Sequence, residues 1–290
     1  MDRRSAQAVK WSEGTEQPNT RVPLDACDCH HHIYDARYPF AGKAALRPGD
    51  ALIADYKALQ KRIGTTRNVI VQPSSYGTDN RLLLESIGHF DGKARGIAVV
   101  DTEVTDVGLR ELHSGGVRGI RFNLAPPGTT TLAMVKPLAA RIATLGWHVQ
   151  VNAPAAFLLE ARAIWADLPV PVVFDHLARV PQPNATQHPA FLMVRDLLQQ
   201  QKAYVKLSGF YNESLVGAPS YADAVAEAAA YAREAPERVL WGSDWPHPTE
   251  QPHKIPNDAG LLDAFAEAVP GEAVRQLILV DNPARLYQFS

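Results

Sequence analysis

Short runs of apolar and β-branched residues recur along the chain, and each is followed by a longer segment with apolar positions every three or four residues. Continuous apolar runs of this kind are typical of strands that are buried on both faces, as in a parallel sheet. The predicted strands are Ala26–Ile33, Asn68–Gln72, Ala94–Asp101, Val117–Asn123, His148–Asn152, Pro171–His176, Ala203–Ser208 and Val239–Asp244.

The segments between these strands have the spacing of amphipathic helices. In Thr131–Leu145 apolar residues recur at helical intervals, and Gly146 can end a helix there. Pro137 interrupts this segment, so we expect its helix to be kinked or to begin later. Ser220 and Asp223 have the spacing of a capping box, which predicts the start of another helix.

Eight strands, each followed by a helix, are the count of a closed (β/α)8 barrel, and 290 residues suit one. A doubly wound open sheet has the same alternation and stays an alternative. No glycine-rich pattern for nucleotide phosphates is present in the sequence. We therefore expect an α/β protein with a single (β/α)8 TIM barrel over residues 23–290. A polar, disordered N-terminal arm over residues 1–22 is expected to precede it.

Charge, apolar stretches and cysteine spacing indicate which partners and which cellular compartment to expect. The formal net charge is -2 and no basic run occurs, so neither nucleic acid nor an anionic membrane is an expected partner. No secretory signal and no apolar stretch of about 18–20 residues is seen, which predicts a cytoplasmic protein. Cys27 and Cys29 are too close on one strand for a disulfide, and we expect reduced thiols packed on its outer face.

Polar residues stand at the ends of most predicted strands. Both candidate architectures place their sites at the carboxyl ends of the strands. If side chains alternate along the first strand, Asp28, His30 and His32 share one face, while Cys27, Cys29 and His31 share the other. Two inward imidazoles can reach one metal ion or one substrate oxygen. The alternative is a pair of structural histidines, which are costly to bury without partners.

Two later strand ends add an imidazole and a carboxylate. His176 follows the apolar run of the sixth strand, and alternation places its neighbour Asp175 on the opposite face. Asp244 ends the eighth strand, where Gly242 permits a close approach of the backbone. A buried carboxylate needs a histidine, a metal or water beside it. We therefore predict one site that contains His30, His32, His176 and Asp244.

At this point the motifs resemble a known family. They are similar to the amidohydrolase superfamily, and within it to the branch of lactone hydrolases and decarboxylases that includes 2-pyrone-4,6-dicarboxylate lactonase-like proteins. The motifs are Asp28–His32, Val71–Arg81, Gly119–Asn123, Phe174–His176, Lys206–Gly209 and Gly242–His247. They run in order from about residue 25 to the end of the chain, and the combination is more specific for the branch than for a substrate.

The resemblance implies that the site holds either one divalent metal ion or none. In many members of the superfamily, residues that match His30, His32, His176 and Asp244 hold zinc. No carboxylated lysine is evident at the end of the fourth strand, where Arg121 and Asn123 stand, so a two-metal site is not expected. His148 begins its strand and lies at the wrong end to be a ligand. Because the branch includes lactonases that need no metal, the expected cofactor is either none or one divalent metal, with zinc preferred.

The expected reaction is the opening of a sugar-derived or aromatic-catabolic lactone that carries a carboxylate. Asp244 would activate water, and the three histidines would stabilise the oxyanion directly or through zinc. Arg121 is the preferred partner of a substrate carboxylate, with a structural salt bridge as the alternative. The other residues predicted to bind substrate are Ser75, Tyr76, Asn152, Arg179, Tyr211 and His247.

Related activities remain open from sequence. Where dicarboxylate lactonases have an arginine after the seventh strand, this chain has Tyr211 and Asn212, which suits fewer carboxylates or a hydroxylated sugar lactone. A zinc-dependent decarboxylase and a lactone isomerase are the alternatives, and a non-catalytic metabolite-binding barrel is a third. We expect the loops Tyr34–Asp50 and Pro246–Pro256 to cover the site. A small-molecule lactone is the expected partner, and an oligomer is possible.

Overall fold

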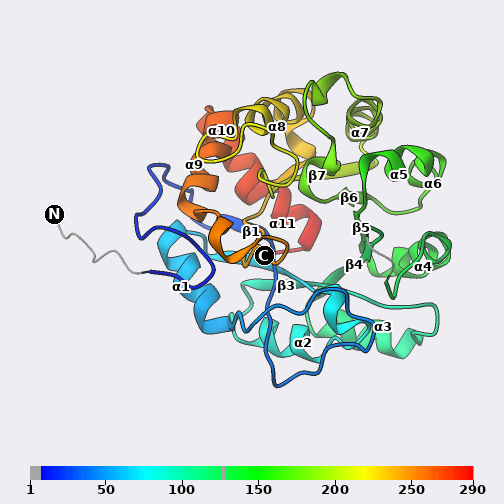
Figure 1. The fold of residues 1–290 in the computed structure, drawn as a ribbon. Coiled ribbons are helices and arrows are strands. Elements are labelled where there is room, and N and C mark those ends of the chain that lie inside the picture. Colours follow the sequence, from blue (N-terminus) through cyan, green and yellow to red (C-terminus); the bar gives the residue numbers. More distant parts are fainter. Residues whose placement is uncertain (1–7, 126–127, 290) are drawn as a thin grey trace.

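The computed structural model describes residues 8–125 and 128–289, and it contains one sheet of eight parallel strands in chain order (Figure 1). The strands are β1 Cys27–His31, β2 Arg67–Val71, β3 Ala94–Ala98, β4 Val117–Asn123, β5 His148–Asn152, β6 Val172–Phe174, β7 Ala203–Leu207 and β8 Val239–Trp241. Each strand lies within a predicted strand or extends it by one residue. The sequence-based assignment of eight strands is therefore confirmed.

The sheet closes where the chain beyond β8 meets β1. The amide of Asp244 donates to the carbonyl of His30 at 2.8 Å, and the amide of His32 donates to the carbonyl of Trp245 at 2.8 Å. Gly242 lies at this junction, where an added Cβ would stand 2.6 Å from the Cβ of His30. These contacts make a (β/α)8 barrel and exclude the open sheet. They also bring His30, His32 and Asp244 together.

Helices surround the barrel on its outer side (Figure 1). They are α1 Ile53–Ile63, α2 Arg81–Gly88, α3 Asp106–Ser114, α4 Val135–Ile142, α5 Ala155–Glu160, α6 Arg162–Ala166, α7 Pro189–Gln199, α8 Ala222–Glu234, α9 Asp258–Ala268, α10 Glu272–Gln276 and α11 Asn282–Tyr287. A π-helical segment, Leu277–Asp281, joins the last two. No helix in the described ranges has the length and apolar character needed to span a bilayer.

Two apolar layers fill the molecule. The larger layer packs the outward faces of the strands against the helices. The smaller one lies inside the barrel, where residues such as Cys27, Val69 and Tyr204 meet Tyr287 of α11. Arg95 at the start of β3 also bonds to the carbonyl of Tyr287. Helix α11 therefore covers the amino-terminal end of the barrel, and the site is left at the carboxyl end.

A β-bulge in β1 changes which side chains face the barrel interior. Pairing with β2 shifts between Asp28 and His31. Asp28 accepts a hydrogen bond from Tyr56 of α1 at 3.0 Å, and His31 stacks on the same ring at 3.4 Å. Both therefore face the helices although they are three residues apart, which strict alternation does not allow. The expectation that Asp28 shares a face with His30 was wrong, while the outward direction of His31 is confirmed.

The same bulge overturns the expected position of the two cysteines. Cys27 and Cys29 belong to the apolar cluster inside the barrel and not to the outer face of β1. Both are fully buried free thiols. The extra residue in the bulge lets Cys29 and His30 both face inward, so the cysteines form the apolar floor beneath the histidines.

As expected from Pro137, the helix within Thr131–Leu145 begins later: α4 starts at Val135, so Pro137 lies in its first turn, where proline is tolerated. Two other local expectations differ from the structure. Ser220 makes no capping box, because Asp223 instead accepts bonds from the amides of Leu215 and Val216. Residues 1–7 lie outside the described residues, but residues 8–22 are held against the barrel, for example by bonds from Arg62 to the carbonyls of Glu13 and Gly14.

Candidate active site

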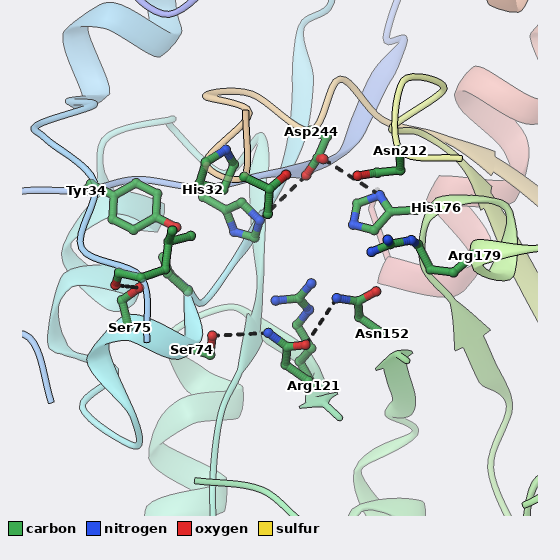
Figure 2. A pocket seen from close by; sticks show the side chains of 15 residues that line it. His32, Tyr34, Ser74, Ser75, Arg121, Asn152, His176, Arg179, Asn212 and Asp244 are labelled. Atoms are coloured by element: carbon green, nitrogen blue, oxygen red, sulfur yellow. Dashed lines mark hydrogen bonds and ion pairs between the residues drawn. The ribbon is translucent and has the colours of Figure 1, made fainter. Parts of the chain in front are cut away.

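A polar pocket opens at the carboxyl end of the barrel. The space between its walls is about 480 Å³, and this volume includes open solvent at the mouth. Figure 2 shows Asp244, His32 and His176 along one side, with Arg121 and Asn152 across from them. The lining residues are His32, Tyr34, Leu46, Pro73, Ser74, Ser75, Arg121, Asn123, Asn152, His176, Arg179, Asn212, Asp244, Pro248 and Thr249. The two loops expected to cover the site therefore both contribute to its wall.

The carboxylate of Asp244 lies among three imidazoles. Its Oδ1 is 3.6 Å from His30 Nε2 and 3.7 Å from His32 Nε2, and its Oδ2 is 3.8 Å from His176 Nδ1. His32 donates from Nδ1 to the carbonyl of Val71 at 2.8 Å, so its Nε2 is the bare nitrogen that faces the site. The four residues predicted from strand ends are thus brought together, from the carboxyl ends of β1, β6 and β8.

Unusual backbone conformations direct two of these side chains. Asp244 has a φ of 64°, and His176 begins a left-handed turn in which residues 176–179 all have positive φ. Such conformations cost about 1–3 kcal/mol for each non-glycine residue and are concentrated at functional sites. The turn after β6 explains why Asp175 and His176 both reach the site, although alternation placed them on opposite faces.

Burial sets the charge of the cluster. It lowers the pKa of His30 and His176 well below the usual range, and lowers that of His32 to about 3. Lys206 and Arg121 add to this effect at His30, because they disfavour a second positive charge nearby. Burial also raises the pKa of Asp244 to about 6, against the hydrogen bond from Tyr211. Near neutral pH the site therefore holds an ionised carboxylate among neutral imidazoles.

A buried network of charged and polar groups lies beneath the histidines. Asp175 Oδ2 accepts from Arg121 Nε at 3.1 Å and from Gln150 Nε2 at 3.2 Å. Lys206 Nζ donates to Gln150 Oε1 at 2.7 Å and lies 3.3 Å from His30 Nδ1. Burial opposes the ionised form of Asp175, but Arg121 and Lys206 outweigh it and lower its pKa. The network supports the site from below and holds one edge of the Arg121 guanidinium.

A second chain of hydrogen bonds lies behind Asp244. Tyr211 donates to Asp244 Oδ2 at 2.6 Å, and its oxygen is 3.0 Å from His247 Nδ1. His247 Nε2 in turn lies 3.2 Å from Asp258 Oδ2 at the start of α9. Neither Tyr211 nor His247 lines the pocket. Their geometry makes them partners of Asp244 instead of groups that meet the substrate.

The remaining predicted residues differ in position. Arg121, Ser75, Asn152 and Arg179 line the pocket, as expected for groups that bind substrate. Tyr76 does not line it, since its hydroxyl bonds to the amide of Asp35 at 2.9 Å.

Sequence reasoning missed several residues of the site. Tyr34, Ser74 and Asn123 line the pocket but were not predicted to bind substrate, whereas Asn212, which the sequence related to substrate choice, also lines it. Ser74 and Asn152 both bond to Asn123, at 3.2 and 3.1 Å. A signal for Asn123 was available, because it is the last residue of its predicted strand. Lys206 also had a signal, since a lysine inside the apolar run Ala203–Leu207 needs a buried partner.

The residue types and spacing can accommodate a divalent cation. Among the described residues, His30, His176 and Asp244 each offer a ligand atom, and these atoms lie within 4.8 Å of one another. Ligands at zinc–nitrogen and zinc–oxygen distances in a tetrahedral site are about 3.4 Å apart, close to the separations of 3.6–3.8 Å between Asp244 and the imidazoles. His32 Nε2 is also bare and suits a metal.

The contacts of Tyr211 lead to a prediction that separates its two possible roles. Tyr211→Phe removes the hydrogen bond to Asp244 and should lower kcat about 10-fold or more, because bonds to charged groups contribute roughly 1.5–3 kcal/mol. KM should stay near its original value, as the hydroxyl does not face the pocket. Steady-state kinetics test this, with Tyr38→Phe as the control, because Tyr38 is half-buried, does not line the pocket and donates its hydroxyl to Glu85. A raised KM with unchanged kcat would restore Tyr211 as a substrate-binding residue.

Comparisons with known proteins identify the family of this chain. The family model described as amidohydrolase matches residues 27–289. The chain is 35% identical to a 2-pyrone-4,6-dicarboxylate hydrolase of Comamonas testosteroni, over 96% of this chain and 95% of that protein. It is 34% identical to a 4-sulfomuconolactone hydrolase of Rhizobium radiobacter, over 92% and 91%. It is also 29% identical to a D-galactarolactone isomerase of Agrobacterium fabrum, over 98% of both chains. The sequence, the closed barrel and these matches lead to one conclusion: the chain belongs to the amidohydrolase family.

Proposed function

We propose that this protein is a hydrolase that opens a carboxylate-bearing lactone. The observation that carries the proposal is the Asp244 carboxylate, which stands among three neutral imidazoles at the edge of a pocket that also holds Arg121. A base, hydrogen-bond donors and an anion-binding group are the parts that hydrolysis of such an ester requires. Two of the three relatives described above are named as hydrolases of a pyrone or a lactone.

The reaction would proceed through a tetrahedral intermediate. Asp244 takes a proton from water as the water oxygen bonds to the lactone carbonyl carbon. An imidazole N–H of the site other than that of His32, whose Nε2 is bare, donates to the oxyanion, and such a well-placed donor is worth about 3 kcal/mol. The bond between this carbon and the ring oxygen then breaks, and the leaving alkoxide takes the proton from Asp244. One water is consumed, and the product is a hydroxy acid with one more carboxylate than the substrate.

The pocket favours a substrate that carries both charge and hydroxyl groups. Among the described residues, Arg121 bonds to Asp175 through Nε, which leaves both Nη groups for a substrate carboxylate. Arg179 forms an ion pair with Glu213 at 2.7 Å, and this pairing offsets its positive charge. Ser74, Asn123 and Asn152 add neutral donors and acceptors. These groups suit a sugar-derived lactone with one carboxylate better than a substrate with several.

A divalent metal is compatible with this proposal but is not required by it. If one is bound, His30, His32, His176 and Asp244 would hold it, and it would polarise the lactone carbonyl as a Lewis acid. Zinc is the metal that such ligands favour. None of the three relatives named above is a decarboxylase, whereas one is a lactone isomerase. Isomerisation is therefore the second candidate function.

The test is a pH-indicator assay of the purified protein against a panel of lactones, with and without chelator. The panel contains sugar-acid lactones, aromatic-catabolic lactones and an uncharged sugar lactone as a matched comparison. Proton release with a carboxylate-bearing lactone supports the proposal, and its survival in chelator assigns the reaction to the protein's own groups. If a lactone is consumed without proton release, NMR of the product identifies isomerisation, and the hydrolase proposal is rejected.

The role of Arg121 has its own expected result. Arg121→Met should raise KM for a carboxylate-bearing lactone about 10- to 100-fold, because charged hydrogen bonds are lost. KM for an uncharged lactone should change little. Arg118→Met is the matched control, since Arg118 lies on the same strand but bonds to the carbonyls of His113 and Val117. Equal losses for charged and uncharged lactones would show that Arg121 acts only as the structural partner of Asp175.

A further inference from the structure

Lys206 is a fully buried lysine directly beneath the candidate site. It stands near the carboxyl end of β7, and its Nζ donates to the carbonyl of Cys29 at 2.8 Å and to Gln150 Oε1 at 2.7 Å. His30 Nδ1 lies 3.3 Å from the same Nζ, with hydrogen-bond geometry. Asp175 Oδ1 is farther away, at 3.8 Å. An ammonium group has three hydrogens, and acceptors surround it here.

These contacts decide which nitrogen of His30 carries hydrogen. Two groups compete for Nδ1, since Asp175 Oδ1 also lies 3.2 Å from it. Within the described part of the chain, however, Asp175 Oδ1 takes part in no hydrogen bond, so the ring is not aligned to donate to it. Nδ1 therefore accepts from Lys206. A neutral imidazole that accepts at Nδ1 carries its hydrogen on Nε2.

We propose that Lys206 is a positioning residue that fixes the tautomer of His30, so that the Nε2–H of His30 points into the site. This Nε2 is buried, has no hydrogen-bond partner among the described residues and lies 3.6 Å from Asp244 Oδ1. It is a donor available to the oxyanion of a substrate. The assignment of the tautomer stands without any activity, while the effect of Lys206 on turnover rests on the proposed lactone hydrolysis.

The proposal has a consequence for metal binding. A histidine can ligate a cation through Nε2 only when that nitrogen is bare, and metal-binding histidines commonly donate their other N–H to a carboxylate. Asp175 is suitably placed for that role, but Lys206 holds Nδ1 in the accepting state. Lys206 therefore opposes ligation by His30. Removal of its charge and hydrogens should let His30 turn to Asp175 and bind zinc through Nε2.

The first test is NMR of the full-length protein with ¹⁵N-labelled histidine. Long-range ¹H–¹⁵N correlations distinguish the two neutral tautomers, and the His30→Gln variant identifies the signals of His30. The expected result is a bare Nδ1 and a protonated Nε2 on His30 in the protein after treatment with chelator. A protonated Nδ1 overturns the proposal. This measurement uses the natural protein and does not depend on whether a Lys206 variant folds.

The second test is Lys206→Met, which keeps the length of the side chain and removes its donors. Titration with Zn²⁺ alone should give about 10-fold tighter binding than the natural protein, in line with the usual effect of groups that orient a metal-binding histidine. With a lactone substrate, kcat should fall about 100-fold at nearly unchanged KM in metal-free buffer. Lys202→Met is the matched control, because Lys202 is exposed and bonds to the carbonyl of Ala166.

The outcomes separate the two proposals. Unchanged zinc affinity and an unchanged His30 tautomer in folded Lys206→Met overturn the role of Lys206. If no lactone is hydrolysed by the natural protein, the proposed function fails, but the tautomer and the zinc titration still test Lys206. Equal losses of kcat in Lys206→Met and Lys202→Met would show that the effect is not specific to the site, which also counts against the proposal.

Discussion

Asp244→Asn is expected to lower kcat about 10³-fold, while KM changes by no more than a few-fold. General-base catalysis contributes about 10²–10⁴-fold, and an amide cannot take the proton from water. The size and shape of the side chain are nearly retained, so the pocket and its arginines should still bind substrate. Steady-state kinetics with the best lactone of the panel measure both constants.

The control for this change is Asp196→Asn, at a surface aspartate whose carboxylate accepts hydrogen bonds from its neighbour Arg195. It should leave both constants unchanged. A result in which Asp244→Asn alters the apparent affinity alone would contradict the assignment of Asp244 as the base. It would favour a barrel that binds a metabolite without transforming it.

Gly242→Ala is expected to destabilise the protein by about 3 kcal/mol or more. A Cβ at this position would lie 2.6 Å from the Cβ of His30 and 2.8 Å from its backbone nitrogen. Backbone atoms cannot move aside as a flexible side chain does, so the end of β8 would be forced away from β1. Overpacking typically costs about 1–3 kcal/mol, and contact with the backbone at a barrel junction places this case at the upper end. Chemical denaturation with a two-state fit measures the change.

Gly88→Ala is the matched control for Gly242. It lies at the end of α2, and a Cβ added there would have no atom within 4 Å. Replacement of a helical glycine that has free space should be neutral or stabilise the fold by up to about 1 kcal/mol. Equal stability of the two variants would mean that β8 and β1 can separate at low cost.

The architecture could be predicted from sequence because strands buried on both faces have a strong pattern. Val172–Phe174 and Ala203–Leu207 are short apolar runs, and their ends carry the polar residues of the site. The rule that sites lie at the carboxyl ends of parallel strands then selected His30, His32, His176 and Asp244. That selection needed only the order of the elements and no detail of packing.

The details that failed were those in which the chain departs from regular geometry. The β-bulge in β1 turns Asp28 toward the helices and Cys29 toward the barrel interior, and no residue type in β1 predicts a bulge there. A left-handed turn after β6 brought both Asp175 and His176 to the site. Tyr211 and His247 follow strand ends, as substrate-binding residues do. Tyr211 nevertheless donates to the carboxylate of Asp244, and His247 contacts the Tyr211 hydroxyl, so neither lines the pocket. Position along a strand predicts proximity to a site, whereas side-chain direction depends on tertiary packing.

The junction between β1 and the end of β8 has a consequence for biosynthesis. His30 and His32 leave the ribosome early, whereas their partner Asp244 is among the last parts of the barrel to emerge. Until then β1 has an unpaired edge, and an edge of this kind is prone to associate with other strands. A truncated chain that ends before Gly242 would retain three histidines without their carboxylate. The contact between β1 and the residues that follow β8 closes the barrel and also completes the site. Lactone turnover should therefore be measurable only in chains that are long enough to close the barrel.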